Sequence, residues 1–198
     1  VIGGCVGTSC TYTAKTFGTV ASGTMAHSFV QSFDSEYDAF KAYAEMYPDD
    51  CTLLIDTYDT INSGIVNAIK VFNEILVPNG YRPKAVRLDS GDLAYLSKKI
   101  RVILDDAGFK DCKICVSNSL DEFLITSLLV QGAQIDSFGV GENLITAKSD
   151  PVFSGVYKLC AIEKGGKIIP KIKISNNATK ITNPGFKKVY RFYSKNTR

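Results

Sequence analysis

The chain has 198 residues, a length that suits one large domain or part of a larger protein. Its net charge of +3 comes without a basic run or an arginine-rich arm, so the composition gives no reason to expect a nucleic acid partner. No stretch approaches the roughly 20 apolar residues of a membrane span, and no signal-peptide pattern opens the chain, so we expect no membrane partner.

The six cysteines are scattered, and several lie inside apolar runs, which is not the spacing of a disulfide framework. Cys112 and Cys115 form a C-x-x-C pair, but a zinc site needs four ligands, and neither a second pair nor a histidine is near them in sequence. We therefore expect reduced thiols, no metal ligated by side chains, and a cytoplasmic protein.

Both ends of the chain predict a piece of a longer protein. Val1 begins a short apolar run without an initiating methionine, and residues 1–4 have the pattern of a strand. The last residues follow directly on another β-like run at 188–193. The chain therefore starts and stops beside elements that we expect to belong to a larger fold.

The N-terminal part of the chain predicts two strands separated by a loop. Gly7, Thr8 and Ser9 form the loop after the first apolar run, and the β-branched residues at 19–23 form the second strand. Small residues beginning at Gly23 then open into a loop that carries His27.

Beyond this loop the hydrophobic pattern alternates between helices and strands. Ser35 and Asp38 match a capping box, which predicts a helix that ends before Pro48. Apolar residues recur at helical spacing in three later segments, which end near glycines. The predicted helices cover residues 39–47, 65–76, 93–104 and 123–128, and the predicted strands cover residues 51–55, 84–88, 113–116 and 135–138.

This alternation is typical of an α/β fold with parallel strands, either a barrel or an open doubly wound sheet. In both architectures the carboxyl ends of the strands form the face that carries the site. Polar residues or glycines follow consecutive predicted strands at that face, namely Thr8, Ser9, His27, Asp56, Asp59, Arg87, Asp89, Ser117, Ser119, Gly139 and Gly141. A shared site explains this pattern, while helix capping by Ser90, Ser119 and Asp59 or Thr60 is the alternative explanation for part of it.

After residue 150 the pattern changes to short alternating runs. Residues 156–162 and 167–174 flank a turn that contains Gly165 and Gly166, which predicts a hairpin. Residues 188–193 alternate like one more strand. We therefore divide the chain into an α/β portion over residues 1–150 and a β-hairpin extension over residues 151–198.

His27 is the only histidine of the chain, so it is the only imidazole available for acid, base or nucleophilic chemistry. Asp56 and Asp59 follow the strand predicted at residues 51–55 and lie at the same face, so either carboxylate could hold the His27 ring in one tautomer. Side chains alternate along a strand, so Arg87 and Asp89 lie on one side of theirs. They form either a structural ion pair or a site for an anionic or aromatic group and sugar hydroxyls.

Glycines and hydroxyl groups end the next two predicted strands. Gly139 and Gly141 let a ligand approach the backbone closely, which favours a phosphate cradle, although a tight turn explains the same pattern. Ser117 and Ser119 end the neighbouring strand and would complete such an anion pocket. From the residues alone, the chain is a parallel α/β enzyme with a phosphate site, a carboxylate–histidine pair and an arginine, and its reaction stays open.

Five segments carry long motifs in a fixed order. They are Gly23-Thr-Met-Ala-His-Ser-Phe-Val-Gln-Ser-Phe33, Leu54-Ile-Asp-Thr-Tyr-Asp-Thr60, Val86-Arg-Leu-Asp-Ser-Gly-Asp92, Phe138-Gly-Val-Gly-Glu-Asn-Leu144 and Lys180-Ile-Thr-Asn-Pro-Gly-Phe-Lys-Lys-Val-Tyr-Arg191. Together they closely resemble the nicotinate phosphoribosyltransferase family, and the resemblance runs essentially from end to end. It implies an incomplete parallel α/β barrel of the type II phosphoribosyltransferase kind, with residues 151–198 in a smaller β-rich domain.

The resemblance also implies an activity: nicotinate and phosphoribosyl pyrophosphate condense to nicotinate mononucleotide and pyrophosphate, in the first step of NAD salvage from nicotinate. ATP and Mg2+ take part, and ATP hydrolysis is coupled through a phosphohistidine, which falls on His27 with Asp56 orienting the ring. Arg87 would contact nicotinate and Asp89 the ribose hydroxyls. The remaining substrate contacts fall on Thr8, Ser9, Ser117, Ser119, Gly139 and Gly141, the last four at the 5-phosphate. The family further implies a homodimer.

Two departures from the family pattern bear on the site. Cys10 stands where the family has an asparagine, which affects any substrate contact from that loop. The family's N-terminal region, with an aromatic residue for the nicotinate ring and basic residues for pyrophosphate, is absent from these 198 residues. A catalytically incomplete fragment or degenerate copy that acts only in binding or dimerisation is therefore the alternative.

Other enzymes with similar folds are further alternatives. A nicotinamide- or quinolinate-using relative shares the fold, but quinolinate enzymes have no ATP-linked histidine, so His27 argues against that group. A barrel aldolase or isomerase would also carry a phosphate handle. A Schiff-base aldolase requires a lysine at a strand end, and none of the predicted strand ends supplies one.

Overall fold

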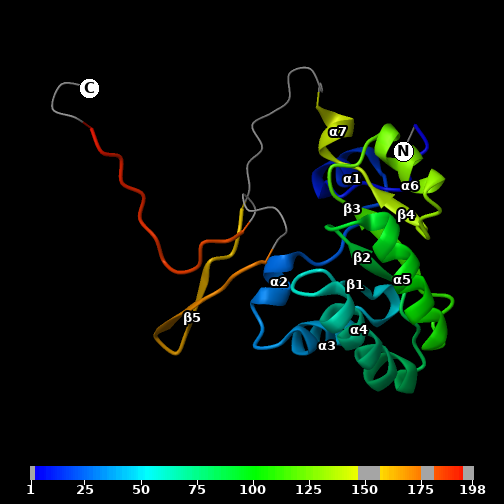
Figure 1. Ribbon diagram of the computed structural model, residues 1–198, viewed down its shortest axis with the longest axis horizontal. Coiled ribbons are helices and arrows are strands. Elements are labelled where there is room, and N and C mark those ends of the chain that lie inside the picture. Colours follow the sequence, from blue (N-terminus) through cyan, green and yellow to red (C-terminus); the bar gives the residue numbers. More distant parts are fainter. Residues whose placement is uncertain (1–2, 147–156, 175–180, 194–198) are drawn as a thin grey trace. The chain divides into compact units, whose positions relative to one another are not determined.

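The computed structural model describes residues 3–146, 157–174 and 181–193. The chain divides into two compact units, Val1–Val152 and Phe153–Arg198, which we describe separately. Figure 1 shows the first unit as helices around a small sheet and the second as a two-stranded ribbon with an extended tail. Of the strand predicted at residues 1–4, the first two residues lie outside the described ranges, while Gly3 and Gly4 form a turn and not a strand.

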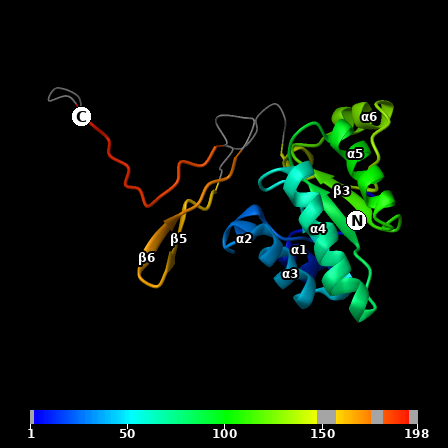
Figure 2. The same cartoon turned by 60° about the horizontal axis from the view of Figure 1, so that its bottom comes forward.

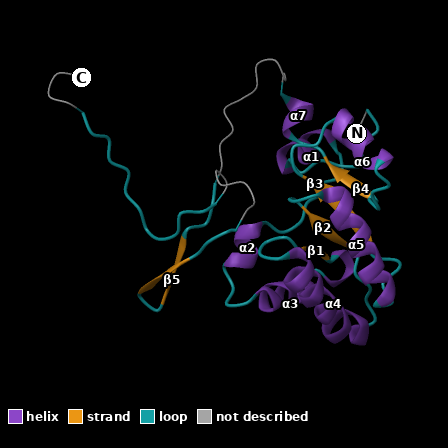
Figure 3. Ribbon diagram, viewed as in Figure 1, coloured by secondary structure: helices purple, strands orange, loops and turns teal. Residues whose placement is uncertain are grey.

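The first unit is built on a four-stranded sheet in which neighbouring strands are parallel (Figure 3). Its strands are β1 (Thr52–Leu54), β2 (Ala85–Leu88), β3 (Lys113–Ser117) and β4 (Ser137–Gly139), in that spatial order. Leu54 pairs with Arg87, and Arg87 pairs with Cys115, so the carboxyl ends of β1, β2 and β3 reach the same edge. All four strands predicted between residues 51 and 138 are confirmed, and so is the parallel α/β class.

Helical segments connect these strands. Among the described residues they are α1 (Thr11–Phe17), α2 (His27–Gln31), α3 (Glu36–Met46), η1 (Pro48–Asp50), η2 (Thr60–Gly64), α4 (Ile65–Val71), η3 (Phe72–Leu76), η4 (Val77–Asn79), α5 (Leu93–Asp106), α6 (Glu122–Val130) and α7 (Glu142–Ile145). Figures 1 and 2 show α5 lying along the sheet with α4 beside it. The run from η2 to η4 is continuous and ends at Gly80, whose φ of 80° suits the left-handed position that closes a helix.

The helix caps agree only in part with the sequence pattern. The Ser35 hydroxyl accepts from the Asp38 amide, as the capping-box motif predicts. Asp59 caps η2, which also agrees with the prediction. The caps predicted at Ser90 and Ser119 are wrong, because Asp92 and Asp121 accept the amide hydrogen bonds at the starts of α5 and α6. Each serine lies two residues before the observed cap, and the Ser90 hydroxyl donates to Asp56 instead.

The segment before residue 35 differs most from the prediction. In place of a strand over residues 19–23, Ala21 forms a single parallel bridge with Thr8, closed by hydrogen bonds from the Thr8 and Ser22 amides. Helix α1 was not predicted, because its threonine-rich sequence has low helix propensity. His27 is the first residue of α2 and does not lie in a loop.

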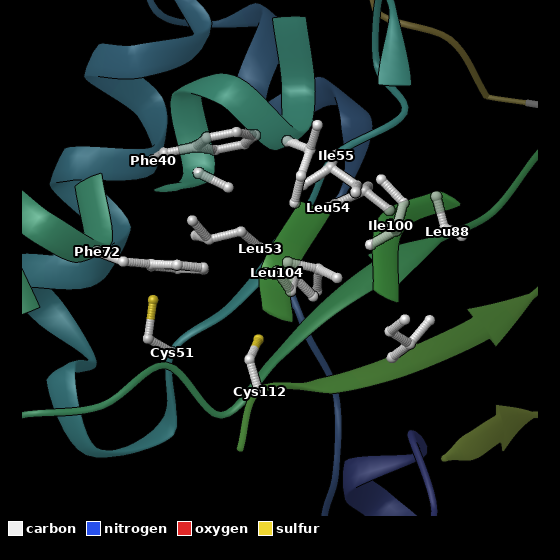
Figure 4. Close-up of a cluster of buried hydrophobic side chains, with 14 of the residues drawn as sticks. Phe40, Cys51, Leu53, Leu54, Ile55, Phe72, Leu88, Ile100, Leu104 and Cys112 are labelled. Carbon is white, nitrogen blue, oxygen red and sulfur yellow. The ribbon is translucent and has the colours of Figure 1, made fainter. Parts of the chain in front are cut away.

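A single apolar cluster fills the space between the sheet and its helices. Figure 4 shows Phe40, Leu53, Phe72 and Leu104 directed into it, and all four are completely buried. Cys51 and Cys112 point their sulfurs into the same cluster (Figure 4), and burial raises the pKa of both thiols to about 12. All six cysteines are free thiols.

Gly64 brings the helical run from η2 to α4 against the end of β1. A Cβ atom at this position would lie 1.8 Å from the carbonyl oxygen of Ile55, which no side chain tolerates. The absence of a side chain therefore sets how closely the helix can approach the strand end that carries Asp56.

In the second unit, β5 (Ala161–Lys164) and β6 (Lys167–Pro170) form the predicted antiparallel hairpin. Gly165 and Gly166 both have positive φ, as a two-residue hairpin turn requires. The strand predicted at residues 188–193 is wrong, since these residues pair with no other described segment and a strand needs a hydrogen-bonded neighbour. Across the described ranges, no helix is both long and apolar enough to cross a membrane.

Candidate active site

Charged side chains from separate strands meet at the carboxyl edge of the sheet. Asp56 follows β1, Arg87 lies in β2, Asp89 follows β2, and Ser117 ends β3. His27 reaches the same place from the start of α2. The parallel register of the sheet explains the meeting, because it brings successive strand ends to one edge.

Arg87 is held from three directions. Its Nε donates to Ser117 Oγ at 2.9 Å, Nη1 donates to Thr24 Oγ1 at 2.8 Å, and Nη2 donates to Asp89 Oδ1 at 3.1 Å. Ser117 Oγ in turn donates to the same Asp89 oxygen at 2.5 Å. The pairing of Arg87 with Asp89 expected from strand alternation is confirmed, and the guanidinium is fixed in one orientation.

The environment of Asp89 favours its charged form. Burial works against ionisation, but contact with the His27 ring, the hydrogen bond from Ser117 and the charge of Arg87 outweigh it, and they hold the pKa of this carboxyl well below its usual range. The Asp89 side chain still keeps 30% of its surface exposed. A carboxylate whose charged form is favoured, at an accessible edge, suits binding of polar groups or stabilisation of a developing positive charge.

The His27 ring lies between a hydroxyl group and two carboxylates. Its Nδ1 is 3.1 Å from the hydroxyl oxygen of Thr57, which is completely buried. Its Nε2 faces Asp89 Oδ2 at 3.6 Å and Asp56 Oδ1 at 3.9 Å. One ring nitrogen is therefore anchored, and the other is presented to a pair of negative charges.

Asp56 is oriented by its neighbours. Its Oδ2 accepts from the Asp89 amide at 2.9 Å and from Ser90 Oγ at 2.5 Å. Its Oδ1 is buried without a hydrogen-bond partner among the described residues, and the same holds for His27 Nε2. Two unpartnered polar atoms thus face each other, an arrangement that can bind or transfer a proton or hold a ligand atom.

Of Asp56 and Asp59, the two carboxylates that follow β1, only one approaches His27. Asp56 does so, whereas Asp59 caps η2 by accepting from the Ile61 and Asn62 amides. Sequence reasoning missed Thr24, Thr57 and Ser90 as members of this cluster. Thr24 lies in the motif that contains His27, and Thr57 directly follows Asp56, so their positions in the sequence were the only signals that could have found them. Hydroxyl residues are common in loops, and their presence alone does not indicate a site.

The loops after β3 and β4 form a second part of the edge. Asn118 and Ser119 both adopt left-handed conformations, with φ of 105° and 50°, which non-glycine residues rarely do. Asn143 Nδ2 donates to the Ser119 carbonyl at 2.7 Å and holds this turn to α7. A Cβ on Gly139 would lie 3.2 Å from the Ser117 side chain, so the two strand ends approach closely.

The remaining site predictions fall outside the charged cluster. Ser119 in the loop after β3, Gly139 at the end of β4 and Gly141 just beyond it are all exposed. Thr8 accepts from the Cys10 amide and pairs with Ala21, and in the described hydrogen bonds neither Thr8 nor Ser9 joins the Arg87 cluster. No group of three or more metal-ligating side chains occurs in the parts of the chain that the structure describes.

These features define a class: a parallel α/β protein whose site, built around an arginine, two carboxylates and a histidine, lies at the carboxyl ends of its strands. No protein-family model matches the chain. The chain is 53% identical over 193 residues to a nicotinate phosphoribosyltransferase of Bacillus subtilis, which covers 96% of this chain and 38% of the relative. It belongs, by sequence, to the nicotinate phosphoribosyltransferase family.

Two further comparisons agree. A nicotinate phosphoribosyltransferase of Mycobacterium tuberculosis is 43% identical over 190 residues, covering 96% of this chain and 39% of the relative. The crystal structure of human nicotinic acid phosphoribosyltransferase superposes with a TM-score of 0.66 and 27% identity, over 70% of this chain and 38% of that chain. The chain thus spans less than two fifths of the length of these curated relatives.

Proposed function

We propose that this chain carries the carboxyl-edge part of the active site of a nicotinate phosphoribosyltransferase. In that reaction the pyridine nitrogen of nicotinate forms a bond to C1 of the ribose, and the C1–oxygen bond to pyrophosphate breaks. Pyrophosphate leaves with the bonding electron pair, and nicotinate mononucleotide is the other product. The observation that carries the proposal is the cluster of Arg87, Asp89 and Ser117 beside His27.

The two charges of the Arg87–Asp89 pair suit the two organic groups of this reaction. Breaking the C1–oxygen bond makes the ribose positively charged, and the ionised Asp89 carboxylate stabilises that charge and accepts from the ribose hydroxyls. Arg87 binds the nicotinate carboxylate through charge-assisted hydrogen bonds. Each group can act only because the cluster fixes its orientation.

We assign the coupling to ATP to His27. Phosphoryl transfer to the imidazole breaks the bond between the β and γ phosphates of ATP, forms a phosphorus–nitrogen bond and releases ADP; later hydrolysis returns the free ring and phosphate. Thr57 anchors one ring nitrogen, and Asp56, held by Ser90 and the Asp89 amide, faces the other. The carboxylates orient the ring and stabilise its positive charge when it is protonated.

We assign binding of the 5-phosphate to the ends of β3 and β4 and the loops that follow them. Gly139 and Gly141 are exposed and carry no side chain, so a ligand can approach their backbone, and the exposed Ser119 lies on the neighbouring turn. Ser117 is assigned to the same group, although its hydroxyl also orders Arg87 and Asp89. Thr8 and Ser9 are assigned to substrate contacts from the first loop.

Mg2+ enters this reaction with the polyphosphate substrates. It is commonly held by one or two carboxylates together with substrate phosphates and water, not by an all-protein cage. The unpartnered Oδ1 of Asp56 and the exposed face of Asp89 fit that role. Bound there, Mg2+ would neutralise charge on the pyrophosphate leaving group.

The larger assembly is part of the same proposal. The four-stranded sheet forms part of an incomplete α/β barrel of the type II phosphoribosyltransferase kind, within residues 1–150. Residues 151–198 belong to the smaller β-rich domain. The protein acts as a cytoplasmic homodimer on nicotinate, phosphoribosyl pyrophosphate and ATP.

The test is product formation by the full-length protein, with nicotinate or nicotinamide as the pyridine and with or without ATP. ATP-stimulated formation of nicotinate mononucleotide from nicotinate alone supports the proposal. No product under any condition supports the alternative of a catalytically incomplete or degenerate copy that only binds or dimerises.

Replacement of His27 tests the assigned division of roles. His27→Ala is expected to abolish stimulation by ATP and to leave slow ATP-independent turnover, because the imidazole couples ATP hydrolysis and does not carry out ribosyl transfer. The comparison of initial rates with and without ATP measures this. An equal loss of both activities would contradict the division.

A further inference from the structure

Glu36 joins two segments that carry different parts of the candidate site. It is the first residue of α3, which packs against α2, and His27 begins α2. Its partners Ser63 and Asn67 lie in the helical run that follows β1, and Asp56 lies between β1 and that run. The hydrogen bonds of Glu36 therefore bear on how closely His27 and Asp56 approach each other.

These hydrogen bonds are buried. Glu36 keeps 5% of its surface exposed, and its Oε2 accepts from Ser63 Oγ at 2.5 Å and from Asn67 Nδ2 at 3.0 Å. Asn67 Nδ2 also donates to Ser63 Oγ at 3.2 Å, so Glu36, Ser63 and Asn67 form a polar triangle. A carboxyl group is costly to bury, and an apolar side chain of similar volume packs at less cost. Packing alone therefore does not explain the presence of Glu36.

The helical run has no room to move independently of the end of β1. A Cβ on Gly64, the residue after Ser63, would meet the carbonyl oxygen of Ile55, so run and strand end are in direct contact. Asp56 and Thr57 directly follow Ile55, and both approach the His27 ring. A change in the triangle that shifts the run is therefore transmitted to the groups that face the ring.

We propose that Glu36 is a positioning residue that holds Asp56 and Thr57 against the His27 ring. It acts through the polar triangle and makes no described contact with the ring itself. The inference rests on the proposed function, in which His27 couples ATP hydrolysis to the reaction. It adds that this coupling depends on a buried connection between α3 and the helical run after β1.

The experiment compares Glu36→Met with Glu36→Gln in the full-length protein. Methionine has a similar length but no oxygen, whereas glutamine keeps an acceptor for Ser63 and Asn67. For Glu36→Met we expect the increase in rate caused by ATP to fall about 10- to 10²-fold, because small misplacements of reacting groups have effects of this size. The ATP-independent rate should stay within about twofold, because Arg87 and Asp89 are paired outside the triangle. Glu36→Gln is expected to retain both rates.

Two further variants and one direct measurement complete the test. Ser63→Ala breaks the triangle from the helical run and is expected to act like Glu36→Met. Tyr37→Phe removes an exposed hydrogen bond between α3 and η3, from Tyr37 Oη to Glu74 Oε2 at 2.5 Å, and is expected to change neither rate. The NMR signals of the His27 ring, assigned by their absence in His27→Ala, report its surroundings without reference to the reaction. They are expected to shift in Glu36→Met and to stay in place in Tyr37→Phe.

The outcomes separate failure of the inference from failure of the proposed function. Unchanged stimulation by ATP in Glu36→Met, beside its loss in His27→Ala, overturns the inference and leaves the function standing. Equal losses of both rates with a lowered Tm also overturn it, because that pattern marks a structural role. Retained stimulation by ATP in His27→Ala overturns the proposed function. Unmoved His27 signals in Glu36→Met overturn the inference in either case.

Discussion

The two edges of the same sheet carry the same kinds of charged residue in different surroundings. At the amino edge, Lys113 pairs with Asp136 before β4, and both side chains keep a third or more of their surface exposed. The other pairs at this edge are Arg82 with Asp111 and Lys84 with Asp50, and they are exposed as well. At the carboxyl edge, Arg87 and Asp89 are three-quarters and about two-thirds buried and share partners from other elements.

This difference shows that environment, and not residue type, separates stabilising pairs from a site. Exposed pairs are screened by water and contribute little to the free energy of folding. At the carboxyl edge each charged group is fixed by several neighbours, so its orientation is defined before any ligand arrives. Variants at both edges should therefore change different properties, activity at one and a small part of the stability at the other.

The largest effect is expected for Asp89→Asn. The variant removes the charge that the surroundings of Asp89 favour. Under the proposed function this charge stabilises the positively charged ribose, so the rate of nicotinate mononucleotide formation by the full-length protein should fall by about 10²- to 10³-fold. The matched control at the amino edge is Asp136→Asn, which should leave the rate within about twofold. Equal losses of activity in the two variants would contradict the functional difference between the edges.

The next largest effect is expected from a change in packing at the carboxyl edge. In Gly64→Ala the new methyl group meets the Ile55 carbonyl at 1.8 Å, so the helix must move away from β1, and we expect a loss of about 3 kcal/mol in the free energy of unfolding. Urea unfolding measures this loss. Gly23→Ala is the control, because a Cβ there meets nothing within 4 Å. If the two variants were equally stable, the close approach of helix and strand would not be a constraint.

Glu36, which bonds to Ser63 and Asn67 in the helical run that follows β1, is expected to make the free energy of unfolding depend on pH. Burial, together with repulsion from Asp56 and Asp59, raises the pKa of this carboxyl despite hydrogen bonds from Ser63 and Asn67. A raised pKa in the folded state favours folding below the unfolded pKa of about 4.3, and this contribution is lost as pH rises through the folded value.

Glu36→Gln keeps the shape of the side chain and remains neutral. We therefore expect the variant to be more stable than the unchanged protein at pH 7 and equally stable below about pH 4, as measured by urea unfolding at each pH. A difference that stays constant with pH would show that packing, and not charge, separates the two.

The smallest effect is expected at the amino edge. Lys113→Gln breaks the exposed pair with Asp136 and should lower the free energy of unfolding by about 0.5 kcal/mol or less. The difference should shrink further in high salt, because exposed charges are screened. A loss above about 2 kcal/mol would show that the two edges are more alike than their exposure indicates.

Much of the fold follows from the sequence pattern. The predicted strands at 51–55, 84–88, 113–116 and 135–138 were found within two residues, because each is a short apolar run between helices of clear period. The segment before residue 35 was not predictable in this way. The strand expected there is a single bridge, and α1 is rich in threonine, so neither propensity nor period marked it.

The site, like the fold, could be predicted from the sequence only in part. Alternation along one strand predicted that Arg87 and Asp89 would pair, and strand order predicted that either Asp56 or Asp59 would reach His27; the structure shows that Asp56 does. The roles of Thr24, Thr57 and Ser90 could not be predicted, since each is a hydroxyl residue that would equally suit a turn or a cap. Their partners lie 63, 30 and 34 residues away in sequence.

The sequence by itself thus determined the parallel α/β class, the edge that carries the charged residues and the family of the chain. These follow from local periodicity, which each segment expresses without reference to the others, and from motifs long enough to be recognised. Only the tertiary structure decided which carboxylate faces His27, which hydroxyl groups hold Arg87 and Asp56, and that Asp59 acts as a cap. Such choices depend on distances of a few ångströms between segments that meet only when the sheet and its helices pack together.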